Sequence, residues 1–124
     1  MLIAFDFDGT LSDSEMTVLL GEEAGVAEEI DDITEQAMND RLSYAESLYA
    51  RAELLDGLTA DRVEAAFDRV ELRPGSADAI DALASAGHHV AILTGGFERG
   101  VANALDAENV AVDTIVANRL PIRN

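Results

Sequence analysis

Apolar residues follow two different periods along this 124-residue chain, and the changes of period divide it into three stretches. Residues 1–7 are mostly apolar, with a β-branched residue and two phenylalanines, and they predict a short buried strand. Over residues 15–72 the apolar positions recur at helical spacing, which predicts amphipathic helices. From residue 73 onward, apolar runs alternate with helical patterns, which is typical of βαβ units and a parallel sheet.

The middle stretch contains signals for four helices. Ser43 and Glu46 fit a capping box that opens the third helix, and Thr59 can cap the fourth. Gly25 and Gly57 are common types of helix stop. Four short amphipathic helices in a row predict a small bundle inserted after the first strand. The helices are expected over residues 15–24, 27–39, 43–56 and 59–71.

The last stretch begins at the breaker Arg73-Pro74-Gly75 and returns to the α/β pattern. It predicts helices over residues 76–86 and 98–107, strands over residues 88–93 and 114–117, and a tail over residues 118–124. The fold class is therefore α/β with a parallel sheet. The expected organisation is a core of residues 1–14 and 73–124 with a helical cap of residues 15–72.

Two carboxylates stand at the end of the first predicted strand. Asp6 and Asp8 are two residues apart, so on an extended chain their side chains point the same way. Gly9 follows at once, where the chain must turn, and ligands of open parallel sheets bind beyond the carboxyl ends of the strands. The two charges repel, and a bound cation or a shared proton relieves this repulsion. A calcium loop is excluded, because Thr10 and Leu11 occupy its third-ligand and glycine positions.

A second candidate site follows the strand predicted at residues 88–93. Thr94-Gly95-Gly96 offers a hydroxyl and glycine N–H groups that lead toward a helix N-terminus, an arrangement that can hold phosphate. Taken alone, the segment is better interpreted as an ordinary strand-to-helix turn. It gains weight because the two strands are expected to be neighbours, which would bring Thr94 close to Asp6 and Asp8.

Composition narrows the classes of function. The chain has 25 acidic residues against 8 basic ones, all arginine, for a net charge of −17. Nucleic-acid binding through a basic patch is therefore excluded, and a hydrophobic content of 48% argues against disorder. The composition resembles that of proteins from salt-loving organisms, in which dissolved cations screen self-repulsion. We expect folding to require high salt.

Features that the sequence lacks bear on its cellular compartment and on its reactive groups. Cysteine is absent, which excludes disulfides, thiolate metal sites and a cysteine nucleophile. The sequence shows no secretory signal, membrane-spanning run or lipidation motif. We therefore expect a soluble, cytoplasmic protein that has no membrane partner.

The segment Asp-Phe-Asp-Gly-Thr at residues 6–10 resembles the signature of the haloacid dehalogenase superfamily of phosphotransferases. The resemblance implies a haloacid-dehalogenase-like (Rossmannoid) parallel-sheet core with an inserted helical cap. It implies that Asp6 is the nucleophile and Asp8 the general acid/base, chemistry that suits two carboxylates. It also implies Mg²⁺ as cofactor, held by the Asp6 carboxylate and the Asp8 backbone carbonyl, and phosphate binding by Thr94 and Gly95.

Six segments in order are similar to the phosphoserine phosphatase family: DFDGTLSDSE, EEAGV, ITEQAM, SLYAR, LTGGF and VANRL. The similarity implies hydrolysis of O-phosphoserine to serine and phosphate through an aspartyl-phosphate, the last step of serine biosynthesis. Glu15 would hold the substrate ammonium and Arg51 its carboxylate, while Met38 and Tyr44 would close over the substrate. Without the family similarity, Glu15 and Arg51 would be interpreted as ordinary charges on helices. Met38 and Tyr44 would be interpreted as ordinary core residues.

Two later motifs of the family, a phosphate-stabilising lysine and a Gly-Asp-Gly-type metal loop, have no counterpart in this sequence. We therefore expect the sheet to lack its C-terminal strands and this chain to turn over slowly. The first strand would be a sheet edge, open to pairing with another chain, so a homo-oligomer is one expectation. The alternatives are another small-phosphomonoester phosphatase or phosphotransferase, or a truncated, non-catalytic homologue that binds phosphate or a partner.

Overall fold

Three parallel strands form the sheet in the computed structural model, which describes residues 1–119. The strands are β1 (Leu2–Phe5), β2 (His89–Phe97) and β3 (Thr114–Asn118), and β2 lies between the other two. The helices are α1 (Met16–Ala24), α2 (Ala27–Met38), α3 (Tyr44–Leu55), α4 (Ala60–Asp68), α5 (Ser76–Ser85) and α6 (Glu98–Ala107). The predicted α/β class and parallel sheet are confirmed, and β1 is an edge strand within the described residues.

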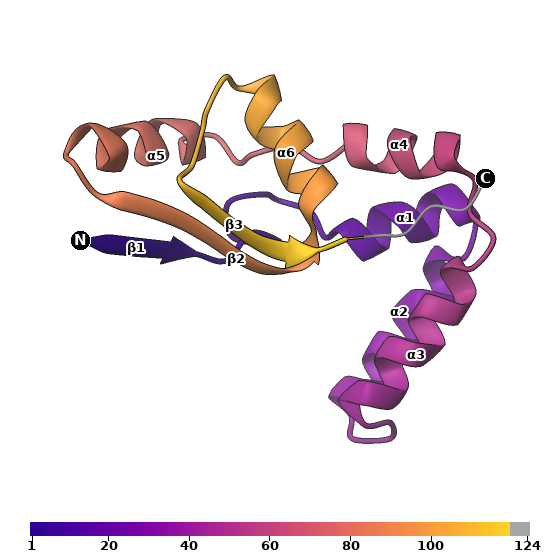
Figure 1. The fold of residues 1–124 in the computed structure, drawn as a ribbon. Coiled ribbons are helices and arrows are strands. Elements are labelled where there is room, and N and C mark those ends of the chain that lie inside the picture. Colours follow the sequence, from indigo (N-terminus) through magenta and orange to yellow (C-terminus); the bar gives the residue numbers. More distant parts are fainter. Residues whose placement is uncertain (120–124) are drawn as a thin grey trace.

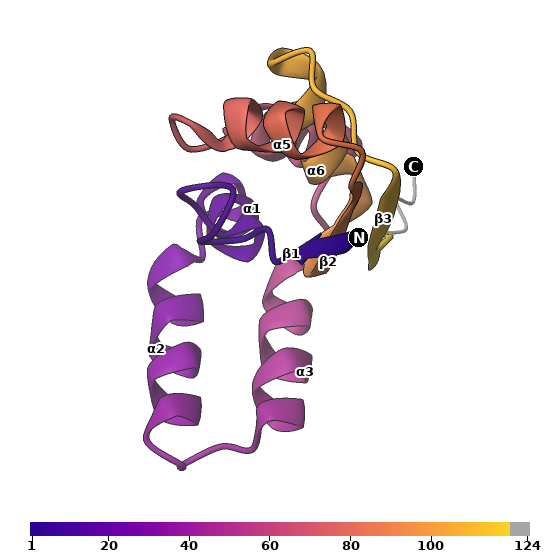
Figure 2. The same cartoon turned by 90° about the vertical axis from the view of Figure 1, so that its left-hand side faces the viewer.

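The sheet is covered by helices on one face only. Helices α5 and α6 lie on that face (Figures 1 and 2), where Val90 and Ile92 of β2 are fully buried. Side chains alternate along a strand, so Leu93 points to the other face, where the register pairs it with Val116 of β3. Leu93 and Val116 are 50% and 56% exposed, and Leu2, on the same face of β1, is 64% exposed. An uncharged apolar surface therefore stays open on this side.

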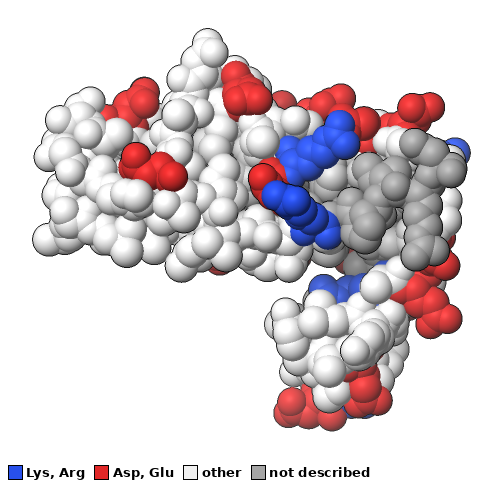
Figure 3. Space-filling model, viewed as in Figure 1, with Lys and Arg blue, Asp and Glu red and all other residues white. Residues whose placement is uncertain are grey.

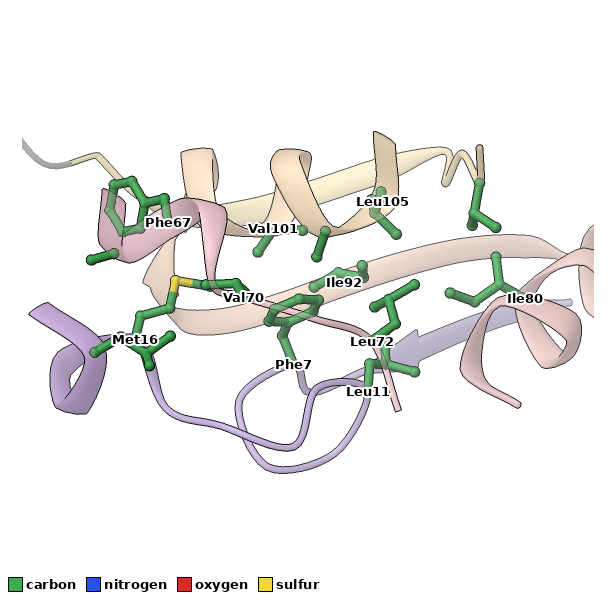
Figure 4. Packing of buried hydrophobic residues seen from close by; sticks show 14 of the residues in the cluster. Phe7, Leu11, Met16, Phe67, Val70, Leu72, Ile80, Ile92, Val101 and Leu105 are labelled. Carbon is green, nitrogen blue, oxygen red and sulfur yellow. The ribbon is translucent and has the colours of Figure 1, made fainter. Parts of the chain in front are cut away.

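The hydrophobic core joins the sheet to α1 and α4. Figure 4 shows Phe7, Met16 and Phe67 in one continuous cluster with Ile92, and all four side chains are almost fully buried. The Phe67 ring also packs at a tilt against Phe97, with ring centroids 6.0 Å apart. Because they share this cluster, α1 and α4 are packed onto the α/β core.

Helices α2 and α3 form a hairpin that projects away from the sheet (Figures 1 and 2). Ile30 and Ser47 are the only buried residues within these two helices. Among the four middle helices, α1 packs against α4, and α2 packs against both α3 and α1. Helices α1 and α4 also reach β2, because Met16 Sδ accepts from Phe97 N and the Phe67 ring packs against that of Phe97. The proposed boundaries of core and cap stay a prediction.

The predicted elements all exist, and their ends differ by a few residues. The capping box is confirmed: Ser43 Oγ accepts from Glu46 N, and Glu46 Oε1 accepts from Ser43 N, both at 3.1 Å. One correction concerns the second strand, which was predicted to end at Leu93 but continues to Phe97. The register between β2 and β3 shifts in between, so the chain crosses Gly95 and Gly96 as an irregular extension of the strand. The predicted tail lies largely outside the described residues.

The charged surface is uneven. On the face shown in Figure 3, acidic side chains gather at the tip of the α2–α3 hairpin, whereas the region over the strands is largely uncharged. No helix in residues 1–119 has the length and apolar character needed to cross a membrane.

Candidate active site

In the turn after β1, three backbone N–H groups share one carbonyl acceptor. The backbone N–H groups of Thr10, Leu11 and Ser12 all donate to Phe7 O, at 3.0, 3.0 and 3.1 Å. Gly9 supplies the positive φ of 75° that this turn requires. The turn places Asp6 and Asp8 at the carboxyl end of β1, which is the expected ligand-binding edge of a parallel sheet.

The two carboxylates lie in different surroundings. Asp6 is exposed, and one of its oxygens, Oδ1, accepts a hydrogen bond of 2.8 Å from Phe7 N. Asp8 is half-buried, and its Oδ1 is buried without a hydrogen-bond partner. Burial raises the pKa of Asp8 to about 6, with further increases from the charges of Glu15 and Asp6, against a lowering by the backbone N–H of Met16. The site therefore holds an exposed carboxylate next to one that binds a proton readily.

Gly96 brings the end of β2 against Asp8. A Cβ at this position would lie 3.0 Å from Asp8 Oδ2 and 3.3 Å from the Met16 Sδ and Cε atoms. The Met16 side chain is also bound to β2, because its Sδ accepts a hydrogen bond from Phe97 N at 3.2 Å. A Cβ at position 96 would therefore require the Asp8 and Met16 side chains to shift by a few tenths of an ångström.

Thr94 and Gly95 lie on the same strand extension, next to Gly96. Thr94 Oγ1 accepts from Gly96 N at 3.0 Å, so this N–H is already used within the segment. Gly95 is exposed, and its carbonyl accepts from Asn118 Nδ2 at 2.9 Å. Helix α6 begins at Glu98, as predicted, and its N-cap residue Phe97 directly follows the segment. The segment thus offers the Thr94 hydroxyl as a side-chain donor to an anion.

The remaining predicted residues divide into two groups. Glu15 is the N-cap residue of α1 and lies close enough to Asp8 to raise its pKa. Arg51 is half-buried on α3, where its Nε donates to Ser47 O of the same helix at 3.3 Å. Met38 and Tyr44 flank the hairpin tip and are 80% and 73% exposed. The structure brings Asp6, Asp8, Glu15 and Gly96 together. Met38, Tyr44 and Arg51 belong to the α2–α3 hairpin, which projects away from the sheet (Figure 1).

Three residues contribute to the site in ways that the sequence interpretation did not predict, and only Gly96 among them had been placed in a candidate site, as part of the Thr94–Gly96 segment. Met16 was an unremarked apolar helix position, and nothing in the sequence distinguishes it from other core residues. Gly96 had a usable signal, because a glycine pair at a strand end often marks a close approach of the backbone. Arg73 was interpreted only as part of a breaker, yet its side chain donates to Gly9 O and Ser12 O in the turn after Asp8.

The carboxylate pair could supply part of the ligand set of a divalent cation. The unpartnered, buried Asp8 Oδ1 and the repulsion from Asp6 are both features that a cation would relieve. No group of three or more potential metal-ligating side chains occurs among residues 1–119. The described part of the chain thus offers two carboxylates, Asp6 and Asp8, to such an ion.

These observations define an α/β domain with a carboxylate pair and the Thr94–Gly96 segment at the carboxyl ends of neighbouring parallel strands. The haloacid dehalogenase-like hydrolase family matches residues 3–123, and the chain belongs to that family. The match extends over both predicted core segments and the helices between them.

Relatives within this family are phosphoserine phosphatases. The chain is 50% identical over 119 residues to phosphoserine phosphatase of Halobacterium salinarum, a match that covers 96% of this chain and 56% of the relative. It is 38% identical to phosphoserine phosphatase of Methanocaldococcus jannaschii, covering 99% of this chain and 57% of the relative. A solved structure described as a phospho-aspartyl intermediate analogue of phosphoserine phosphatase matches with a TM-score of 0.85 at 37% identity, covering 99% of this chain and 58% of that one. The chain thus spans about half the length of these proteins.

Proposed function

We propose that this chain carries the nucleophilic half-site of a phosphoserine phosphatase. The reaction would be the Mg²⁺-dependent hydrolysis of O-phosphoserine to serine and phosphate through an aspartyl-phosphate. The observation that supports this most is the pairing of exposed Asp6 with proton-binding Asp8, directly beside the Thr94–Gly96 segment. The substrate is inferred from the relatives, which are phosphoserine phosphatases.

Asp6 is suited to attack phosphorus. Its Oδ1 is held by Phe7 N, which fixes the orientation of the carboxylate and leaves Oδ2 to form the bond to phosphorus. As this bond forms, the bond between phosphorus and the serine oxygen breaks. The Thr94 hydroxyl and the Gly95 N–H would donate to the phosphoryl oxygens, whose charge is spread over the group in the transition state.

Asp8 is suited to move the proton. Its raised pKa of about 6 keeps a useful fraction protonated near neutral pH, so it can protonate the leaving serine oxygen. The same carboxylate then takes a proton from the water that attacks the aspartyl-phosphate, which releases phosphate and restores Asp6. A Mg²⁺ ion held by Asp6 and Asp8 would supply positive charge to the phosphoryl oxygens.

Substrate recognition would involve Glu15 and the hairpin. Glu15 already lies near Asp8, where a carboxylate can balance the ammonium group of serine. Arg51 would bind the serine carboxylate with two parallel hydrogen bonds, and Met38 and Tyr44 would cover the substrate. In the structure Met38 and Tyr44 are 80% and 73% exposed, so covering the substrate would bury both side chains.

The test is phosphate release from O-phosphoserine by this chain in molar salt with Mg²⁺. Molar salt is used because a net charge of −17 favours unfolding unless cations screen it. We expect Asp6→Asn to lower the rate by about 10³-fold or more. Asp13→Asn, which removes an exposed carboxylate from the same loop, is the matched control and should keep most of the activity. Equal rates for the unmodified chain and Asp6→Asn would refute the proposal.

A non-catalytic role as a binding module is the second candidate, favoured by the open face of the sheet. Leu2, Leu93 and Val116 expose apolar surface there, next to the unpaired edge of β1. A second copy could pair along β1, and light scattering in molar salt measures this. Leu93→Glu should dissociate such a dimer, whereas Tyr49→Glu, at a residue 79% exposed on α3, should not. A monomer at all concentrations would remove this candidate.

A further inference from the structure

The turn after Asp8 directs its carbonyl groups toward one neighbouring segment. Its N–H groups converge on Phe7 O, and its carbonyl oxygens need other donors. Those donors come from the segment that follows α4, where Leu72 forms an isolated antiparallel bridge with Ser12. The bridge lies where the chain enters and leaves the four middle helices.

Arg73 satisfies three carbonyl groups of this turn. Its backbone N–H donates to Leu11 O at 2.7 Å, its Nε to Ser12 O at 3.2 Å, and its Nη2 to Gly9 O at 3.1 Å. Ser76 Oγ adds a fourth bond, to Leu11 O at 3.0 Å. The side chain of Arg73 thus reaches both ends of the turn that directly follows Asp8.

The side-chain partners of Arg73 are backbone carbonyl groups, not carboxylates. Arg69 differs from it, because Arg69 pairs with Glu22 and Glu23 at 2.9 and 3.5 Å. Within residues 1–119, no carboxylate oxygen lies within 4.0 Å of the Arg73 guanidinium. Its side-chain hydrogen bonds all go to backbone carbonyls beside the active-site carboxylates.

We propose that Arg73 is a positioning residue for the Asp6–Asp8 pair. Its guanidinium holds the Gly9–Ser12 turn in one conformation and so fixes the direction in which the chain leaves Asp8. The same contact joins the entry and exit segments of the helical insertion, which couples the insertion to the catalytic turn. The catalytic consequence rests on the proposed function, whereas the effect on the turn does not.

The geometry of the guanidinium group makes this role specific to arginine. A planar guanidinium can donate through Nε and Nη2 to two separate carbonyl oxygens at once. A lysine ammonium keeps the positive charge, but it is a point donor on a flexible stem and cannot hold both ends of the turn. The conservative substitution Arg73→Lys therefore separates the effect of the positive charge from the effect of the guanidinium geometry.

The test compares amide hydrogen exchange in Arg73→Lys, Arg73→Ala and the unmodified chain, measured by NMR in molar salt. The reporters are the amides of Thr10, Leu11 and Ser12, and the amide of Ala104 in α6 is the distant reference. We expect both substitutions to speed exchange in the turn by about tenfold while Ala104 stays within twofold. Arg69→Lys, which alters an arginine paired with glutamates, is the matched control and should leave the turn unchanged.

Each other outcome overturns the proposal. Unchanged exchange in the turn would show that Arg73 does not hold it, and a uniform increase that includes Ala104 would show a general loss of stability. Faster exchange in Arg73→Ala but not in Arg73→Lys would show that charge alone is enough. Where the unmodified chain releases phosphate, Arg73→Lys should lower kcat with little change in KM. A chain without activity would count against the proposed function, while the exchange result still decides the role of Arg73.

Discussion

The sheet end of the molecule and the α2–α3 hairpin differ in how firmly their residues are held. At the sheet end, Met16 and Phe67 are almost fully buried in a cluster shared with the strands. In the hairpin, Met38, Tyr44 and Tyr49 are 80%, 73% and 79% exposed. The two regions are joined mainly through α1 (Figure 2).

This difference matches the division of chemistry that we propose. The groups that would make and break bonds, Asp6 and Asp8, lie where packing and close backbone approaches leave little freedom, as preorganised catalysis requires. The residues proposed to recognise the substrate, such as Arg51, lie on the thinly packed hairpin. A hairpin with few buried side chains can move at small cost in free energy.

The largest expected difference between the two regions is the stability lost when an aromatic side chain is removed. Phe67→Ala should lower the free energy of unfolding by about 3–5 kcal/mol, because it leaves a cavity between α4, Met16 and Phe97. Tyr49→Ala on the hairpin should change it by less than about 0.5 kcal/mol. Urea denaturation in molar salt measures both values. Similar losses for the two variants would mean that the hairpin is packed as firmly as the core.

The next effect concerns the close approach at the site. Gly96→Ala should lower the free energy of unfolding by about 1–3 kcal/mol, because the new Cβ meets Asp8 Oδ2 at 3.0 Å and Met16 at 3.3 Å. Gly95→Ala is the control for adding a methyl group to the same segment, since its Cβ would meet nothing within 4 Å. If Gly95→Ala costs as much as Gly96→Ala, the contact with Asp8 and Met16 is not the cause.

A smaller, pH-dependent effect is expected at Asp8. Folding raises its pKa from 3.8 to about 6, so ionisation in the folded state costs stability as the pH rises through this range. Asp8→Asn should therefore raise the free energy of unfolding by about 1 kcal/mol at pH 8, a value that allows for solvent screening. The increase should be smallest near pH 4. Asp13→Asn controls for the loss of one negative charge. A gain for Asp8→Asn that is the same at both pH values would contradict the burial of Asp8.

The smallest effect is expected at the hairpin itself. Ser43→Ala removes the side chain that accepts from Glu46 N at the start of α3, which should lower the melting temperature by about 2–4 °C. Ser85→Ala, at the exposed end of α5, is the matched control and should have no measurable effect. Circular dichroism follows both transitions. No shift for Ser43→Ala would show that the capping box contributes nothing to the hairpin.

Local signals in the sequence were sufficient for most of the fold. The capping box at Ser43 and Glu46 and the left-handed glycine Gly25 mark helix ends through short-range bonds, and the structure has both. The alternation of strands and helices gave the parallel sheet. The position of the carboxylate pair followed from its place after an apolar run.

The remaining features depend on contacts between distant segments. The packing of α1 and α4 onto the sheet required knowing that Met16 meets Gly100 and Phe67, and nothing local encodes this contact. The contacts of Arg73 with the turn after Asp8 join residues more than 60 positions apart. The continuation of β2 through its two glycines depends on pairing with β3.

The most direct test of the division between the two regions is a ratio of rates. Phosphate release would be measured with O-phosphoserine and with p-nitrophenyl phosphate, which lacks the amino-acid group, for the unmodified chain and three variants. Asp6→Asn should lower both rates alike, because it removes the nucleophile for either substrate. Arg51→Ala should lower the O-phosphoserine rate far more, and Arg41→Ala, at the hairpin tip, should change neither ratio nor rate. An equal loss on both substrates in Arg51→Ala, or no release by the unmodified chain, would contradict the account.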